Sequence, residues 1–257
     1  MAKTKAKSPA KPAKLVKKSA KPAKAPKAPK STRVTKPAAL PVGPPPPPPV
    51  RDELSAPRDI SRLTRYGERF GAHKIDVRMW TPPSSPQPTT LPVASGSLAI
   101  FDPAVPKSWR VFDRPTGSGQ FRIMLSIARS DDAKIKERLA AVVIHCGRPP
   151  IARWTVAHYK GQKAPKTADA IPRCTVTSGY IALVDVGAGS PGVVAVPPTE
   201  GIQPVEIPLT DGRRVLALPC SNGEIAAYWA VDAQDKPICI VIDFDVFTQK
   251  DWKSRAT

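Results

Sequence analysis

The first fifty residues contain no acidic and no aromatic side chain, although the chain of 257 residues has 21 Asp and Glu, five Trp, four Tyr and six Phe. They contain twelve Lys, one Arg and 13 of the 33 prolines, and therefore carry +13 of the formal charge of +19. Without large apolar groups, a segment cannot offset the conformational entropy that folding removes. Residues 1–50 are therefore predicted to form a disordered, polycationic tail.

Long apolar runs are also lacking, since no stretch approaches the ~18 consecutive apolar residues that a membrane-spanning helix needs. The basic start of the chain is not followed by the apolar region of a secretory signal peptide. The four Cys are widely spaced and form no CxxC pair, which is typical of reduced thiols rather than of disulfides or a zinc site. The sequence predicts a cytoplasmic protein without a membrane span, with association with the nucleoid as one option.

The tail repeats a short basic unit, KPAK, at residues 11–14 and 21–24. Such a segment releases condensed counterions when it lies along phosphates, which favours binding to DNA or RNA without reading the base sequence. The side chains expected to make these contacts are Lys11, Lys14, Lys17, Lys18, Lys21, Lys24, Lys27 and Lys30. In composition the tail resembles the Lys/Ala/Pro-rich tails of linker histones. A role in solubility, or in binding an anionic membrane or an acidic partner, remains an alternative.

Proline-rich segments divide the rest of the chain. Six consecutive prolines, Pro44–Pro49, predict a stiff spacer at the end of the tail. Residues 51–90 are charged and rich in proline, and they are predicted to form a linker with one short helix before Gly67 or Gly71. Residues 91–257 are predicted to form one strand-rich globular domain.

Alternating hydrophobicity is the main structural signal in this domain. Phe121, Ile123, Leu125 and Ile127 recur with the period of two that is typical of a strand with one buried face. Short runs rich in β-branched residues favour further strands at 139–146, 151–159, 176–186, 193–196, 205–209, 213–218, 224–231 and 239–244. The dipeptides at 211–212 (Asp-Gly) and 222–223 (Asn-Gly) predict tight hairpin turns. The expected fold is mainly β, an antiparallel sandwich or barrel-like domain, with short helices at 130–138 and 247–255.

Two segments of the domain resemble each other, Ser95–Asp102 (SGSLAIFD) and Ser178–Asp185 (SGYIALVD). Each has a small-residue turn, an apolar run and a closing aspartate. A fainter similarity links residues 151–157 with 225–231. Either the domain contains an internal duplication, or this is a common way for a strand to begin and end.

Four aspartates stand at or near the ends of predicted strands, and they are Asp102, Asp185, Asp243 and Asp245. A cluster of three carboxylates could hold a divalent cation, whereas the alternative role of a strand-end aspartate is to cap the following turn. On a strand, Asp243 and Asp245 would share one face and repel each other unless a cation or a basic side chain lay between them. The sequence assigns no catalytic residue, no metal ligand and no cofactor.

Four short motifs occur in the domain: the Ser95-Gly96 strand that ends at Asp102-Pro103, the Trp154 strand, the Ser178-Gly179 strand that ends at Asp185, and the apolar strand Ile240–Phe244. Together they resemble the domain of unknown function 4241 family over about residues 91–247. The glycine-rich run that usually precedes the last strand is reduced here to Ser-Asn-Gly at 221–223. The resemblance implies a strand-rich bacterial domain and supplies no catalytic residue.

The sequence therefore favours a non-enzymatic binding module that its tail tethers to DNA or RNA, with a protein partner of the domain as an option. A metal-dependent hydrolase using the strand-end aspartates is one alternative. An immunity-type or scaffold protein that binds another protein is a second alternative.

Overall fold

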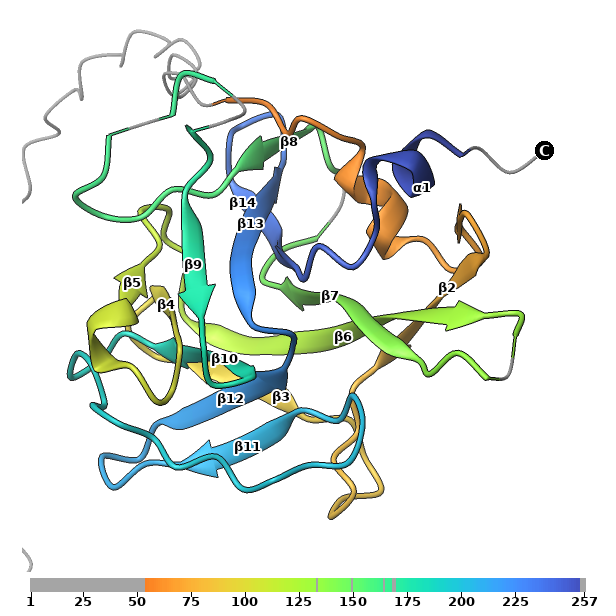
Figure 1. Cartoon of the computed structure of the whole chain (residues 1–257). Helices are drawn as coiled ribbons and strands as arrows, with labels where there is room; N and C mark the ends of the chain where they lie inside the picture. The colour runs from red at the N-terminus through yellow and green to blue at the C-terminus, as the bar shows by residue number, and fades with distance from the viewer. Residues whose placement is uncertain (1–53, 133, 149, 164, 168–169, 255–257) are drawn as a thin grey trace, which may run out of the picture. The chain divides into compact units, whose positions relative to one another are not determined.

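The computed structural model describes residues 54–132, 134–148, 150–163, 165–167 and 170–254 (Figure 1). The predicted tail and its eight lysines lie outside these residues. All of the described residues belong to one compact unit, which spans residues 46–257.

Antiparallel pairing dominates this unit, which confirms the predicted fold class. Of the described residues, nine strands form a first sheet in the order β1-β2-β6-β7-β14-β13-β8, with β3 paired to β6 and β9 to β13. They are β1 (Arg69–Phe70), β2 (His73–Met79), β3 (Thr90–Val93), β6 (Gly119–Ser130), β7 (Arg138–His145), β8 (Arg153–Val156), β9 (Arg173–Val176), β13 (Gly223–Val231) and β14 (Pro237–Asp243). A second, five-stranded sheet has the order β11-β12-β10-β4-β5. Its strands are β4 (Leu98–Phe101), β5 (Arg110–Val111), β10 (Tyr180–Asp185), β11 (Val205–Pro208) and β12 (Arg214–Pro219).

The main core lies between the two sheets. Phe121, Ile123, Leu125 and Ile127 of β6 are all buried in it, whereas Arg122 is exposed, as the period of two predicted. A second core cluster covers the other face of the first sheet, beneath the 3-10 helix η1 (Ile60–Thr64) and the helix α1 (Gln249–Lys253). These two helices lie next to each other in Figure 1, where η1 is orange and α1 is dark blue. A third cluster lies on the outer face of the second sheet.

The strand order of the first sheet is symmetric about the β7–β14 pair. On one side β6 and then β2 follow β7, and on the other side β13 and then β8 follow β14. Strand β3 joins β6 with Leu91 opposite Phe121, and β9 joins β13 with Cys174 opposite Ile225, in the same register. Two halves of the domain therefore share one connectivity, with β11 as an addition in the second half.

The similar segments Ser95–Asp102 and Ser178–Asp185 occupy equivalent places in the two halves. They contain β4 and β10, which pair antiparallel with Ile100 opposite Leu183, the equivalent residue. This is the arrangement that a two-fold duplication produces, so the structure supports the duplication. The fainter similarity of 151–157 to 225–231 is unrelated to it, because β8 is the neighbour of β13 and the counterpart of β2.

The folded domain begins earlier than the sequence predicted. Strand β2 lies in the predicted linker, yet it pairs with β6 from His73, opposite Ser130, to Met79, opposite Met124. Charged residues alternate with Ile75 and Val77 along this strand. The average composition of the segment is therefore charged, and it does not reveal that one side of the strand is apolar. The short helix expected before Gly67 is present as η1.

Four local predictions need correction. The described residues between Ser130, the end of β6, and Arg138, the start of β7, form turns and bends and no helix. Residues 222–223 do not form a hairpin turn, because β12 and β13 belong to different sheets. Residues 193–196 are not a strand, although Val194 packs on the outer face of the second sheet. The strand expected at 176–186 is two strands, β9 and β10, since Gly179 has a φ of +79° and turns the chain between them.

The helix predicted near the C-terminus is confirmed as α1, which a reciprocal pair of hydrogen bonds between Thr248 and Asp251 caps. Within the described part of the chain, no helix is long and apolar enough to cross a membrane.

Candidate functional site: a cationic pocket beside Asp243

Two of the four strand-end aspartates cap turns in the second sheet. Asp102 accepts hydrogen bonds from the backbone N–H groups of Thr177, at 2.7 Å, and Ser178, at 3.1 Å. Asp185 accepts hydrogen bonds from the backbone N–H of Ser95, at 3.1 Å, and from its hydroxyl group. Each aspartate thus binds the serine–glycine turn of the other half of the domain, a contact that the sequence did not predict. Asp102 also caps the turn that follows it, as predicted, since it accepts a hydrogen bond from the backbone N–H of Ala104 at 2.9 Å.

The capping role also sets the ionisation of Asp102. Burial alone would raise the pKa of this carboxyl group, but hydrogen bonds from Ser178, Thr177 and Ala104 outweigh burial and hold the pKa below its ordinary value. Asp102 is therefore an ionised carboxylate whose lone pairs are already used.

The four aspartates do not come together as a metal site. Among the residues that the structure places, no group of three His, Cys, Asp or Glu side chains could hold a metal ion. Asp102 and Asp185 lie at opposite ends of the β4–β10 pair, whereas Asp243 and Asp245 lie close together at the end of β14.

Asp243 ends β14 and is only 3% exposed. Burial raises the pKa of its carboxyl group to about 6, and the carboxylate of Asp245 adds to this effect, while Arg58 and Arg173 partly oppose it. Asp243 accepts a hydrogen bond from the backbone N–H of Asp245 at 2.9 Å.

The two neighbouring aspartates do not share one face of a strand, because β14 ends at Asp243. Asp245 adopts a φ of +51° and forms an ion pair with Arg58, whose Nη2 lies 3.1 Å from its Oδ1. Arg58 is therefore a basic side chain beside the two carboxyl groups, as expected from the repulsion between them.

Strand register brings a second arginine to this corner. Arg173 on β9 stands opposite Ala226 on β13, and Ala226 stands opposite Asp243 on β14. Side chains of directly opposite residues project from the same face of a sheet. The methyl group of Ala226 therefore separates a guanidinium from a buried carboxyl group and leaves space above itself.

A pocket of about 380 Å³ opens beside this row at Arg173, on the face of the first sheet that η1 and α1 cover. We call it the cationic pocket. It is lined by Pro57, Arg58, Ile171, Arg173, Tyr228, Gln249, Trp252 and Lys253. Three of these side chains are cationic, two are aromatic and none is acidic. A second pocket of about 390 Å³ adjoins it through Arg58, Arg173 and Gln249, and contains Asp245.

Contacts with neighbouring side chains hold two members of the pocket in place. The guanidinium of Arg58 lies 4.9 Å from the ring centroid of Trp252 in a cation–π contact. The indole in turn packs its edge against Phe70, with ring centroids 4.9 Å apart. Burial and the nearby carboxyl group of Asp243 raise the pKa of Tyr228 to about 12, so its phenol stays protonated.

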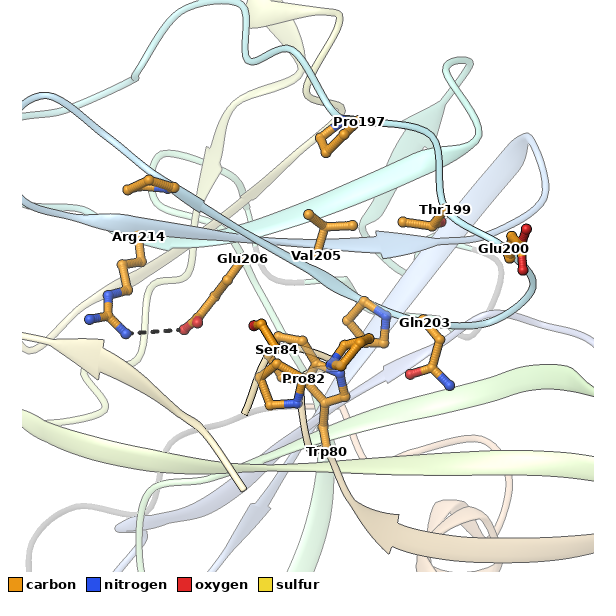
Figure 2. Close-up of a pocket in the computed structure, with 13 residues that line it drawn as sticks. Trp80, Pro82, Ser84, Pro197, Thr199, Glu200, Gln203, Val205, Glu206 and Arg214 are labelled. Carbon is orange, nitrogen blue, oxygen red and sulfur yellow. Dashed lines mark ion pairs between the residues drawn. The ribbon is translucent and has the colours of Figure 1, made fainter. Parts of the chain in front are cut away.

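The larger pocket in Figure 2, of about 750 Å³, has a different chemistry. It is lined mainly by Trp80 and by five prolines, Pro82, Pro83, Pro197, Pro204 and Pro208. Glu206 and Arg214 lie 3.5 Å apart on its wall and neutralise each other. This pocket is therefore suited to an apolar ligand, and the cationic pocket to an anion.

The sequence predicted only Asp243 and Asp245 of this site. Arg58 lies in a segment that was predicted to be a linker, and Arg173 begins a short strand without a motif. Two local signals for the site were available in the sequence: Arg173 stands shortly before the strand predicted at 176–186, and Trp252 lies in the predicted C-terminal helix.

The fold is thus that of a duplicated, mainly antiparallel β domain with a cationic pocket on one sheet. Residues 91–190 match the model of a family described as protein of unknown function (DUF4241), and this region of the chain belongs to that family, as the motifs within it predicted. The match ends before the Ile240–Phe244 strand, the last of the four motifs. No curated protein and no solved structure matches the chain.

Proposed function

We propose that the protein is a non-enzymatic nucleic-acid-binding protein, which its polycationic tail tethers to DNA or RNA and whose β domain is a binding module. The observation that carries this proposal is the charge of +13 in residues 1–50 without a single acidic residue. Residues 51–257 carry 27 basic and 21 acidic side chains, so their net charge is only +6 although this part of the chain is about four times as long as the tail. The tail is therefore the main source of attraction to phosphates.

The same charge predicts how affinity depends on salt. Each phosphate that a lysine neutralises releases condensed counterions, and the slope of log affinity against log salt is about −0.9 for each such phosphate on a duplex. If about half of the tail charges engage phosphates, the slope is roughly −5 to −6. Flexible ammonium groups do not read base edges, so affinity is nearly independent of sequence.

A mobility-shift assay at low salt tests the proposal. Deletion of residues 1–50 is expected to abolish binding to a DNA duplex and to leave the melting temperature of the domain nearly unchanged. A full-length control with the tail residues in scrambled order keeps its charge and is expected to bind as well as the original. A second variant, with Gln in place of the eight named lysines, is expected to bind much more weakly.

Undiminished binding by the truncated protein would show that the tail is not the tether. Binding of the intact protein to anionic vesicles but not to DNA or RNA would also contradict the proposal, because it would assign the tail to a membrane surface.

A further inference from the structure

We propose that the cationic pocket binds a nucleoside phosphate, either a free nucleotide or the phosphorylated end of a single strand. The geometry by itself selects an aromatic anion, and the choice of a nucleotide rests on the proposed function.

Charge is the first argument for this ligand. Arg58 precedes η1, Arg173 lies on β9 and Lys253 lies on α1, so three separate segments bring cations to one pocket. None of the described residues that line this pocket is acidic. Within the described residues, no acidic side chain lies within ion-pair distance of Arg173 or Lys253. The guanidinium of Arg173 makes one long hydrogen bond, 3.4 Å, to the backbone oxygen of Glu224. Its remaining donors suit the bidentate recognition of a phosphate group.

One of the cations, Arg58, is also held in place before a ligand arrives. Arg58 is fixed between the ring of Trp252 and the carboxylate of Asp245. Side chains that are already ordered lose little entropy when they bind a ligand, which favours affinity.

Size and apolar surface indicate the rest of the ligand. A volume of about 380 Å³ is near the lower end of the ~300–1,000 Å³ typical of small-molecule sites, so the pocket suits one nucleotide unit rather than a duplex. Pro57, Ile171, Tyr228 and Trp252 provide apolar and aromatic walls for a base, and the amide of Gln249 can both donate and accept hydrogen bonds.

Titration calorimetry with the full-length protein tests the pocket. Adenosine 5′-monophosphate is expected to bind, and adenosine or inorganic phosphate alone to bind at least about tenfold more weakly, since each lacks half of the ligand. Arg173→Gln and Lys253→Gln are each expected to reduce affinity for the nucleotide about tenfold. Arg122→Gln is the matched control, because it removes one exposed cation from β6 outside the pocket and should leave affinity unchanged.

Two single-stranded hexanucleotides, with and without a 5′-phosphate, distinguish the two sources of the ligand. If the phosphorylated hexanucleotide binds more tightly than the free nucleotide, the pocket is assigned to strand ends, and tighter binding of the free nucleotide assigns it to free nucleotides. In either case, Arg173→Gln is expected to remove the part of the affinity that depends on the phosphate group. Melting temperatures of all variants show whether they are folded, and Lys253 is exposed on α1, so Lys253→Gln is expected to fold normally.

Three results would overturn the inference: no binding of the nucleotide, equal binding of inorganic phosphate, or equal loss in Arg122→Gln. The tail is tested separately, since duplex binding in the mobility-shift assay is expected to be unchanged in Arg173→Gln. If the protein does not bind the nucleotide but its binding to a duplex still needs the tail, only the inference about the pocket is refuted. Nucleotide binding in a protein that does not bind nucleic acid refutes only the proposed function.

Discussion

Replacement of Asp243 by Asn isolates the effect of a buried carboxyl group on stability. Asp243 is 3% exposed, and its Oδ1 accepts a hydrogen bond from the backbone N–H of Asp245 at 2.9 Å. The amide oxygen of an asparagine can accept the same bond, because the two side chains have nearly the same shape. Asp243→Asn therefore removes an ionisable group while it keeps the packing.

The pKa gives the magnitude of the effect. Burial raises the pKa of Asp243 from its ordinary value of 3.8 to about 6, and one unit corresponds to about 1.4 kcal/mol. Because the folded state binds this proton more tightly than the unfolded state, the free energy of unfolding falls as the pH rises from about 4 to about 6. Ionisation of this one group therefore costs the fold about 3 kcal/mol at pH 7, and none below pH 4.

Urea unfolding between pH 4 and pH 8 measures this difference. The variant and the original protein are expected to be similarly stable near pH 4, and the variant to be more stable by up to about 3 kcal/mol at pH 7. Asp245→Asn is the control, since that side chain is 44% exposed and it should keep most of the pH dependence of the original protein. Parallel curves for Asp243→Asn and the original protein would refute the reasoning.

Two further predictions concern the turn caps and the thiols. Asp102→Ala is expected to lower the free energy of unfolding by about 2–4 kcal/mol, because the N–H groups of Thr177 and Ser178 lose their charged acceptor. Asp131→Ala, on a side chain that is 70% exposed, should cost less than about 1 kcal/mol in the same urea titration, and equal costs would argue against the cap. Burial raises the pKa values of Cys146, Cys174, Cys220 and Cys239 to about 12. Alkylation of native protein at pH 8 should therefore be much slower than in urea, and a thiol that reacts equally fast in both would contradict this.

Local patterns predicted the strands well because each strand has its own signal. Alternation with a period of two reveals β6, whereas β7 and β14 are buried on both faces and are revealed by continuous runs rich in β-branched residues. The segment 130–138 contains charged residues that favour a helix locally, but its described residues connect the paired, antiparallel strands β6 and β7 through turns and bends. Local preference alone therefore gave the wrong prediction for this connection.

The site was less predictable because its members come from distant parts of the sequence. Arg58 and Asp245 are 187 residues apart and Arg173 lies between them, so only the strand order brings them together. A strand-end aspartate also has two roles that sequence does not separate. Asp102 caps a turn with all of its acceptors engaged, whereas Asp243 is buried behind two arginines.

The duplication allows the strand row beside the cationic pocket to be compared between the two halves of the domain. In the first half, Thr90 of β3 stands opposite Arg122 of β6, and Arg122 opposite His145 of β7. The equivalent row in the second half is Arg173–Ala226–Asp243. The first row has its long cationic side chain, the exposed Arg122, in the middle. The second row has a methyl group there, and its charged residues stand on both sides of it. At equivalent backbone positions the arginine is therefore central in one half of the domain and lateral in the other, where Arg173 lines the cationic pocket.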